Sequence, residues 1–342
     1  EQQNINQAIS ILKQLFVDRL STSVSIREQH GHTTTWIANQ PPDAVVFAKT
    51  TDEVSSILKI CHDCGCPAIA FGTGSSLEGH VNAPFGGISI DMSSFDSVLA
   101  VHQADLDVIV HPGVTREGLN KHLRDSGLFF PIDPGANASI GGMAATRASG
   151  TNAVRYGTMK DNVLGLEVVL ADGSVIRTGA NTLKNSTGYN LTQLMVGSEG
   201  TLGIITEATL KLLPLPMFKA LLLVPFSSAE KACEAVSAIF QAGIQPSAME
   251  FMERSAIALA QEFTGDFSLK IDEDVQAHLL IEVDAFRSED LLPQMESILP
   301  VLESCGAKDP LFADDAAAQE KLWFLRRRVG EAVKAASVYK EE

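Results

Sequence analysis

The sequence lacks several features that would assign it to other classes of protein. No apolar run approaches the roughly 20 residues that a membrane-spanning helix needs, and no basic segment followed by an apolar one opens the chain. Because the chain begins at Glu1 without a methionine, a targeting segment could have been removed. Basic residues are also scarce: 26 Lys and Arg stand against 42 Asp and Glu, which gives a net charge of -16. Such a surface repels a phosphate backbone, so we expect no nucleic-acid partner.

Cysteine is scarce as well, and its count argues against a disulfide framework. The chain has an odd number of cysteines and is too long to need disulfide staples: Cys61, Cys64, Cys66, Cys233 and Cys305. We therefore expect a reducing compartment. The cluster at residues 61–66 could suggest a metal centre, but no second Cys or His pair follows at zinc spacing. Cys61 lies on the apolar face of a predicted helix, and we interpret the cysteines as small buried hydrophobic residues.

Length and composition indicate a soluble globular protein with two domains. The 342 residues exceed the roughly 250 to 300 at which single cores stop growing. Apolar residues at helical spacing predict an amphipathic helix over residues 5–20, ending near Ser21. A strand at 45–47, a helix with Thr50 as N-cap and Gly65 as C-cap, and a strand at 67–71 follow. These three elements predict a β-α-β unit.

Later elements predict antiparallel sheets. We expect strands at 88–91, 98–101 and 108–111, a helix at 115–126, a hairpin of 164–170 with 175–177 turning at Asp172-Gly173, and a strand at 202–213. Pro214 and Pro216 mark a boundary. Beyond it we expect a strand at 220–224, helices at 228–242 and 254–262, a strand at 278–283, a helix at 289–305 and a final helix through Trp323. The predicted divisions are 1–39, 40–216 and 217–342.

A glycine-rich loop follows the strand at 67–71. Its residues 71–79 read FGTGSSLEG. Glycines let the backbone turn tightly and aim successive N–H groups at one point, while the hydroxyls add donors, so the loop suits a diphosphate. A dinucleotide fingerprint of the Rossmann type would need a third glycine three residues after the second and then a helix, and a Walker loop would need a lysine. Neither pattern is present, and such a loop by itself is as often a structural turn.

Two further glycine-rich segments follow within about 130 residues. Residues 131–145 read PIDPGANASIGGMAA, in which prolines fix the backbone and small residues leave room for a flat ligand. Ser149-Gly150 and Arg155-Tyr156-Gly157 come next, and residues 197–205 read GSEGTLGII. If these loops were unrelated, their similar glycine-rich composition within so short a stretch would be a repeated coincidence. We therefore interpret the segments as parts of one site.

These segments closely resemble the FAD domain of the vanillyl-alcohol oxidase and p-cresol methylhydroxylase superfamily. Within it they are similar to the FAD-linked D-lactate dehydrogenase (cytochrome) and glycolate oxidase subunit family. The resemblance is strong over residues 40–216 and moderate beyond. It implies an α+β protein with a two-part FAD-binding domain and a C-terminal substrate (cap) domain of antiparallel sheet and helices. Residues 1–39 would be an N-terminal helical segment.

The resemblance also implies which residues bind FAD. By matching position, the pyrophosphate would be held by Gly72, Thr73, Gly74, Ser75, Ser76 and Gly79. The rest of FAD would be held by Pro134, Gly135, Ser139, Gly141, Gly142, Ser149, Gly150, Gly203 and Ile205. Some members of the superfamily attach FAD through a histidine in the first loop, where this chain has Ser75 and Ser76, so we expect non-covalent FAD. His80 lies beyond Gly79, and we interpret it, like His30, His32 and His111, as structural.

Two basic residues of the second domain are candidates for substrate binding. Residues 322–328 read LWFLRRR, and Arg is suited to a carboxylate because its planar fork makes two parallel hydrogen bonds. A solvated basic helix end is the alternative. Relatives carry a carboxylate-binding Arg at the position of Arg326, and some carry a Lys matching Lys340.

The resemblance implies oxidation of a D-2-hydroxy acid, most simply D-lactate to pyruvate, by hydride transfer to flavin N5. Glycolate, D-2-hydroxyglutarate, or a flavin-binding subunit without its own turnover are the alternatives. The family's base and divalent metal ligands lie in a C-terminal segment that we expect beyond Glu342, so the chain looks truncated, with no metal ligand of its own. The implied partners are a small 2-hydroxy acid, a cytochrome or quinone-linked acceptor and a possible second copy in a homodimer. The implied location is a bacterial cytoplasm or inner-membrane face, or a mitochondrion.

Overall fold

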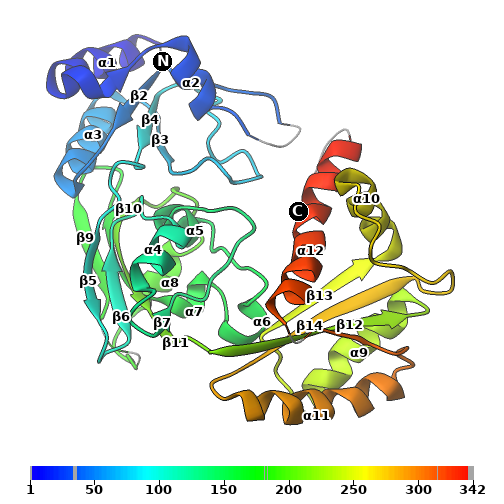
Figure 1. Cartoon of the computed structure of the whole chain (residues 1–342). Helices are drawn as coiled ribbons and strands as arrows, with labels where there is room; N and C mark the ends of the chain where they lie inside the picture. Colours follow the sequence, from blue (N-terminus) through cyan, green and yellow to red (C-terminus); the bar gives the residue numbers. More distant parts are fainter. Residues whose placement is uncertain (1, 34–36, 181, 183, 314, 338–342) are drawn as a thin grey trace. The chain divides into compact units, whose positions relative to one another are not determined.

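The computed structural model describes residues 2–33, 37–180, 182, 184–313 and 315–337 (Figure 1). The chain forms two compact units. Of the described residues, those within 2–150 and 157–214 form the first unit, and those within 151–156 and 215–337 form the second. The short segment 151–156 therefore belongs with the second unit although both its flanks belong to the first. The domain boundaries expected at residues 40 and 217 stay predictions.

A small sheet near the N-terminus carries the first glycine-rich loop. Its strand order is β1 (Leu20–Ser21), β2 (Ala44–Phe47), β4 (Ile88–Asp91) and β3 (Ala68–Phe71). Both β2 and β3 run parallel to β4, which lies between them, so the predicted β-α-β unit is confirmed with a third strand inserted. Helices α1 (Gln2–Phe16) and α3 (Thr51–Cys64) pack beside each other on this sheet, while α2 (Val24–His30) follows β1 (Figure 1).

The ends of α3 follow from local sequence. Thr50 accepts a hydrogen bond from the N–H of Glu53 at 3.2 Å, and Gly65 ends the helix in a left-handed conformation with a φ of 64°. The predicted helix at 5–20 was wrong at its end. It stops at Phe16, and Leu20 instead pairs with Val46 as part of β1.

A larger antiparallel sheet forms the rest of the first unit. Its order is β5 (Val98–His102), β6 (Asp107–Val110), β10 (Ile204–Lys211), β8 (Val163–Val169) and β9 (Val175–Gly179). The predicted hairpin between β8 and β9 is confirmed, with Gly173 at a φ of 84°. The remaining elements of this unit are α4 (Arg116–Leu123), β7 (Leu128–Phe129), α5 (Ile140–Ala145), α7 (Met159–Asn162), α8 (Leu191–Met195) and β11 (Leu213–Pro214).

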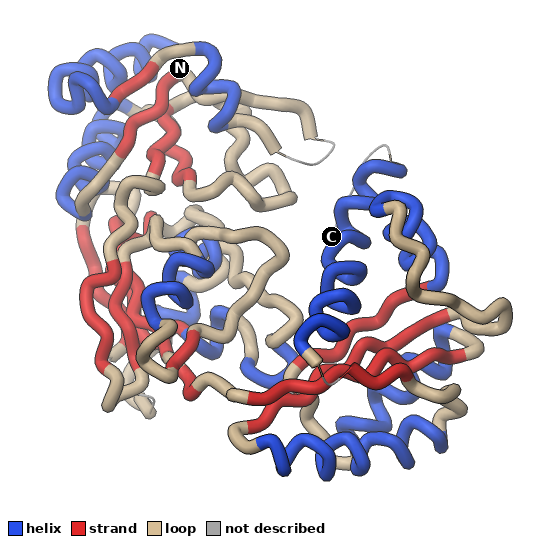
Figure 2. Tube along the Cα trace, in the orientation of Figure 1, coloured by secondary structure: helices blue, strands red, loops and turns tan. Residues whose placement is uncertain are grey.

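The second unit is an antiparallel sheet with helices on both faces (Figure 2). The strand order is β13 (Ala248–Glu253), β14 (Ala277–Ala285), β12 (Phe218–Phe226) and β15 (Leu311–Ala313). Successive residues of β12 pack into two hydrophobic cores, one on each face of the sheet. Leu222 packs with α9 (Ala229–Gln241) and α11 (Leu291–Ser304), whereas Leu221 packs with α10 (Arg254–Thr264) and α12 (Ala316–Ala336). The antiparallel arrangement was predicted, but β13 and β15 were not.

Candidate functional site

The first glycine-rich loop leaves the carboxyl end of β3. Thr73 is exposed and the other candidate residues of the loop are half-buried, so hydroxyls and amides remain accessible. Gly74 has a φ of 65°, and a Cβ added there would lie 2.9 Å from the ring of Phe71. Gly79 has a φ of 77°. The two turns therefore need glycine, both for conformation and, at Gly74, for space.

The second segment touches the first. Ser139 precedes α5, is buried, and its Oγ would lie 2.4 Å from a Cβ placed on Gly72. Glycine at position 72 thus allows the two segments to meet. Gly135 is exposed with open space around it, whereas a Cβ on Gly141 would lie 2.5 Å from Pro112 Cβ. Of these glycines, Gly135 faces open space and Gly141 serves the packing of α5.

The third segment is fastened to the second by its backbone. The N–H groups of Gly197 and Glu199 donate to the carbonyls of Ala144 and Ala145, each at 2.9 Å. Glu199 has a φ of 56° although it is not glycine. Such a conformation costs of order 1 to 3 kcal/mol and tends to mark functional sites. Gly203, another candidate residue, lies against β8, where a Cβ would be 2.6 Å from Val168.

His80 joins the first and third segments. Its Nδ1 hydrogen bonds with the hydroxyl of Ser76, and its Nε2 lies 2.7 Å from Glu199 Oε2, an ion-pair distance without hydrogen-bond geometry. The three glycine-rich segments therefore adjoin one another within the first unit. No pattern in the sequence indicated Glu199, because its contact is with a histidine more than 100 residues away.

The arrangement fits FAD on the evidence of its backbone. A diphosphate needs converging N–H and hydroxyl donors with little steric bulk, and the loop around Gly74 offers both. A cavity of about 460 Å³ in the same unit lies between the C-terminal end of α3, β3 and the third segment. Of the candidate FAD residues only Gly203 lines it, so this cavity is separate from the loop proposed for the pyrophosphate. Among the candidates for the rest of FAD, Ser149 is exposed, Pro134 and Gly150 are half-buried, and Ile205 is buried.

A buried pair supports the first loop from behind. His30 Nε2 lies 2.8 Å from Asp91 Oδ2, and its Nδ1 lies 2.8 Å from the carbonyl of Ile26. The imidazole ring is 4.2 Å from the ring of Phe71, the residue that leads into the loop. Both ring nitrogens therefore lie within hydrogen-bond distance of an oxygen atom. His30, interpreted as structural from the sequence, is buried.

Arg326, on α12, already has a carboxylate partner in the second unit. Its Nη2 lies 2.5 Å from Glu250 Oε2, and its Nε donates to the same oxygen at 2.6 Å. About a third of the Arg326 side chain is exposed, 33% against 14% for Glu250. Arg327 and Arg328 pair instead with carboxylates of their own helix, Glu320 and Glu331. Lys340 lies outside the described residues.

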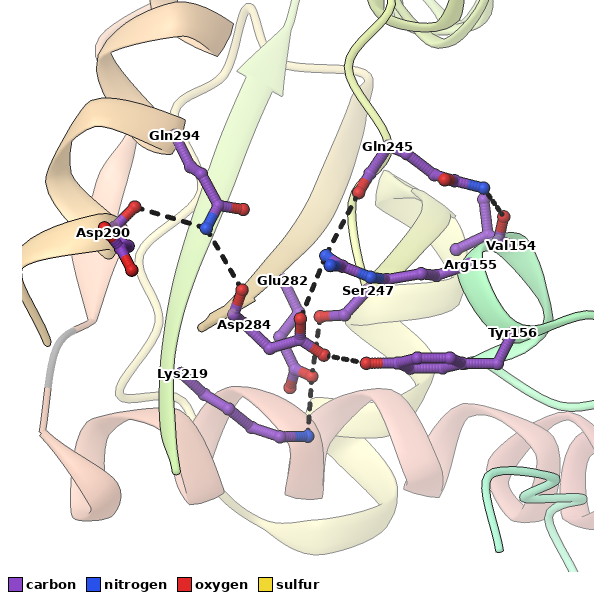
Figure 3. A network of polar contacts seen from close by, with 10 residues as sticks. All are labelled: Val154, Arg155, Tyr156, Lys219, Gln245, Ser247, Glu282, Asp284, Asp290 and Gln294. Carbon is purple, nitrogen blue, oxygen red and sulfur yellow. Dashed lines mark hydrogen bonds and ion pairs between the residues drawn. The ribbon is translucent and has the colours of Figure 1, made fainter. Parts of the chain in front are cut away.

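A polar network surrounds two buried carboxylates of β14 (Figure 3). Asp284 accepts a hydrogen bond from the Tyr156 hydroxyl and pairs with Arg155 at 3.0 Å. Burial, reinforced by the bond to Asp284, raises the pKa of Tyr156. Glu282 is held by Lys219 at 2.8 Å, Ser247 at 3.1 Å and Trp323 at 3.0 Å. Arg155 and Tyr156 thus bind within the second unit, a role that their position among the glycine-rich segments did not indicate.

No group of three or more His, Cys, Asp or Glu side chains in the described ranges is placed to hold a metal ion. Within the same part of the chain, no helix combines the length and apolar character needed to cross a bilayer.

Known families match both units. A family described as FAD binding domain matches residues 42–179, and one described as FAD linked oxidases, C-terminal domain, matches residues 215–342. The chain is similar in fold to p-cresol methylhydroxylase with substrate bound, with a TM-score of 0.79, 19% identity and coverage of 98% of this chain and 72% of that one. The expected fold class is therefore confirmed.

Sequence relatives carry one recurring name. A probable mitochondrial D-lactate dehydrogenase of Danio rerio is 44% identical over 90% of this chain and 61% of its own length. A mitochondrial D-lactate dehydrogenase (cytochrome) of Arabidopsis thaliana is 39% identical, over 94% and 56%. The chain thus spans little more than half the length of these two relatives. A D-lactate dehydrogenase of Anaerostipes hadrus is 32% identical, over 98% and 72%. The chain belongs to the family of FAD-linked oxidoreductases that includes these D-lactate dehydrogenases.

Proposed function

We propose that the protein oxidises a D-2-hydroxy acid with FAD, and that D-lactate, converted to pyruvate, is its substrate. The observation that carries the proposal is the name shared by relatives that match 90%, 94% and 98% of the chain. The adjoining glycine-rich segments support it, since they provide the donors and space that a dinucleotide cofactor needs.

The residues proposed to hold FAD belong to the three segments of the first unit. Gly72 to Ser76 and Gly79 would hold the pyrophosphate, and the candidates between Pro134 and Ile205 would hold the rest. When bound, FAD would accept a hydride from the substrate carbon at flavin N5. We infer that its attachment is non-covalent, because Ser75 and Ser76 stand where relatives with covalent flavin have histidine. His80 is engaged by Ser76 and Glu199 instead.

Arg326 is the proposed ligand of the substrate carboxylate. Glu250 supports the choice, because its contact with Arg326 shows that the guanidinium is placed to bind a carboxylate. Orientation of the substrate by a two-pronged contact would be the contribution of Arg326 to the rate. Lys340 is proposed as a second ligand. The base that removes the hydroxyl proton, and any divalent metal, are proposed to come from residues of the full-length protein outside this chain.

The acceptor and the location are proposed from relatives. The name of the Arabidopsis thaliana relative includes cytochrome and mitochondrial, so we propose a cytochrome-linked acceptor, with mitochondrial placement if the source is eukaryotic. A homodimer remains a proposal that rests on the family resemblance alone.

The test is anaerobic reduction of the bound flavin in the full-length protein. D-lactate should bleach the flavin absorbance, while L-lactate should not, and glycolate and D-2-hydroxyglutarate should act more slowly. If glycolate or D-2-hydroxyglutarate bleached the flavin faster than D-lactate, that acid would be the substrate instead. If the oxidised spectrum persisted with all four acids, the protein would be a flavin-binding subunit and the proposed enzymatic activity would be refuted.

A second measurement addresses Arg326. Arg326→Lys keeps the charge but loses the planar fork, which should cost roughly 1 to 3 kcal/mol and lower kcat/KM by about five- to 150-fold. Arg327→Lys is the matched control, because its carboxylate partner Glu320 lies on the same helix. FAD content should be unchanged in both. An equal loss in the two variants would assign the arginines to a basic helix end instead.

A further inference from the structure

Two thiols meet at the C-terminal end of α3. Beyond the helix the N–H of Gly65 donates to His62 O at 3.0 Å, and the N–H of Cys66 donates to Cys61 O at 2.8 Å. This pair of bonds defines the Schellman motif, in which the outer bond brings together the side chains of the two residues that it joins. Both of those residues are cysteines here. The local backbone therefore places the thiols of Cys61 and Cys66 against each other.

The contact makes the two thiols unequal. Hydrogen bonding from Cys61 lowers the pKa of Cys66, although burial opposes the shift. The same contact, with burial, raises the pKa of Cys61. Since the thiolate is the nucleophilic form of cysteine, these directions favour Cys66 as the attacking sulfur and Cys61 as its protonated neighbour. The Cys66 thiol also donates to the carbonyl of Pro67 at 3.5 Å.

Both cysteines also line the cavity of about 460 Å³ between α3, β3 and the third glycine-rich segment. The side chains are largely shielded, with exposed fractions of 2% for Cys61 and 8% for Cys66. A volume of this size admits small molecules, since one water occupies roughly 30 Å³, but the shielding excludes a protein thiol. Cys64 lies between them in the sequence yet is absent from the lining.

We propose that Cys61 and Cys66 form a hydroperoxide-reactive dithiol site that closes into a disulfide. The Cys66 thiolate attacks one peroxide oxygen, the O–O bond breaks, and hydroxide leaves, so that sulfur becomes a sulfenic acid and loses two electrons to the peroxide. The Cys61 sulfur then attacks the Cys66 sulfur. The S–S bond forms, hydroxide leaves with the Cys61 proton as water, and the net reaction converts two thiols and one hydrogen peroxide into a disulfide and two waters.

The site is independent of 2-hydroxy acid oxidation, because the oxidant is an added hydroperoxide and the thiols are outside the proposed FAD ligands. A disulfide here would join the end of α3 to the start of β3 through a loop of only a few residues. A thiol reductant should restore the dithiol, which is the property that separates this site from irreversible oxidation to sulfinic acid.

The test uses the FAD-loaded protein, reduced and then treated with hydrogen peroxide. After alkylation of the remaining thiols, cleavage on the N-terminal side of aspartate cuts between Cys61 and Cys64 at Asp63 and yields peptides 52–62 and 63–90. A disulfide that includes Cys61 then appears in the mass spectrum as a linked pair of these peptides, two hydrogens lighter than their sum apart from the alkyl group on the remaining cysteine of peptide 63–90. Dithiothreitol should separate the pair.

Two conservative variants identify the partner. Cys64→Ser should still give the linked peptides, because it leaves Cys66 as the one cysteine in peptide 63–90. Cys66→Ser should give none. Linkage that survives Cys66→Ser but is lost in Cys64→Ser would overturn the proposal, as would addition of oxygen to Cys66 without any link. The wild type and Cys64→Ser decide the question even if Cys66→Ser does not fold.

Discussion

Replacing His30 by leucine tests whether the buried pair behind the first loop supports the cofactor site. His30 and Asp91 have side chains that are 4% and 6% exposed, so neither can turn to water when its partner is lost. In His30→Leu the Asp91 carboxylate keeps the N–H of Ser93, at 2.7 Å, but must either stay charged without its main partner or take up a proton. Breaking a buried pair in this way costs about 3 to 5 kcal/mol.

The cost should appear in the stability of the first unit. For a domain of about 150 to 250 residues, each kcal/mol lowers Tm by roughly 2 to 4 °C, so a decrease of about 6 to 20 °C is expected. The assay is thermal and urea unfolding of the FAD-free protein. Titration with FAD should then show weaker binding, because the imidazole ring no longer packs against Phe71, from which the loop departs.

His102→Leu provides the matched control. His102 also contacts an aspartate, with Nδ1 2.6 Å from Asp107 Oδ1, and its own side chain is 42% exposed although that of Asp107 is 2% exposed. Water can reach the side of Asp107 that the exposed imidazole covers, so the expected cost is smaller than that of His30→Leu. If His30→Leu unfolded within 1 kcal/mol of the wild type, or if both variants lost the same stability, the reasoning from burial would be refuted.

The remaining predictions concern the cofactor and the second unit. Gly74→Val should weaken FAD binding about tenfold or more, because it imposes a left-handed φ on a β-branched residue and meets Phe71; titration should show unchanged affinity if the loop has no role. Acid precipitation should release the flavin into the supernatant, and colour retained in the pellet would establish covalent attachment. Burial, and to a lesser extent the charge of Arg254, lowers the pKa of His278 from 6.5 to about 4. As the pH falls from 6.5 to 4, the unfolded chain therefore binds a proton at this histidine that the folded chain does not bind. Stability should therefore decline by up to about 3 kcal/mol between pH 6.5 and 4, and His278→Leu should flatten this part of a urea-unfolding pH profile.

Elements bounded by local interactions were the most predictable part of the fold. The side chain that begins α3 and the glycine that ends it lie within a few residues of the backbone groups that they satisfy, so their spacing is visible in the sequence. The hairpin turn at Gly173 is another case. The same rule would have revealed the contact between Cys61 and Cys66, because it follows from the helix end, but the cysteines were interpreted as independent buried residues.

Strands at sheet edges were predictable only in part. The strand β13 occupies an edge and reads MEFME at positions 249–253, which neither alternates strictly nor contains the β-branched residues that favour a strand. Its pairing with β14 supplies hydrogen bonds that compensate for the weak local preference. The α12 helix, in contrast, continues past the expected end near Trp323 to Ala336, through Gly330, because its apolar face packs on the sheet and on α10.

The candidate site shows why types of residue were easier to predict than their partners. Glycine-rich segments indicate an anion site from the sequence alone. The reason is that each glycine meets a local need for an unusual φ or for space, whatever its partners are. A pair such as Arg326 and Glu250 is separated by 76 residues and depends on two elements, of which one, β13, was not predicted. Sequence therefore suggested a guanidinium suited to a carboxylate without revealing the carboxylate that it holds. This matters for the proposed reaction, because the substrate carboxylate must replace Glu250 at Arg326. The free energy of binding the substrate must therefore exceed that of the Arg326–Glu250 ion pair.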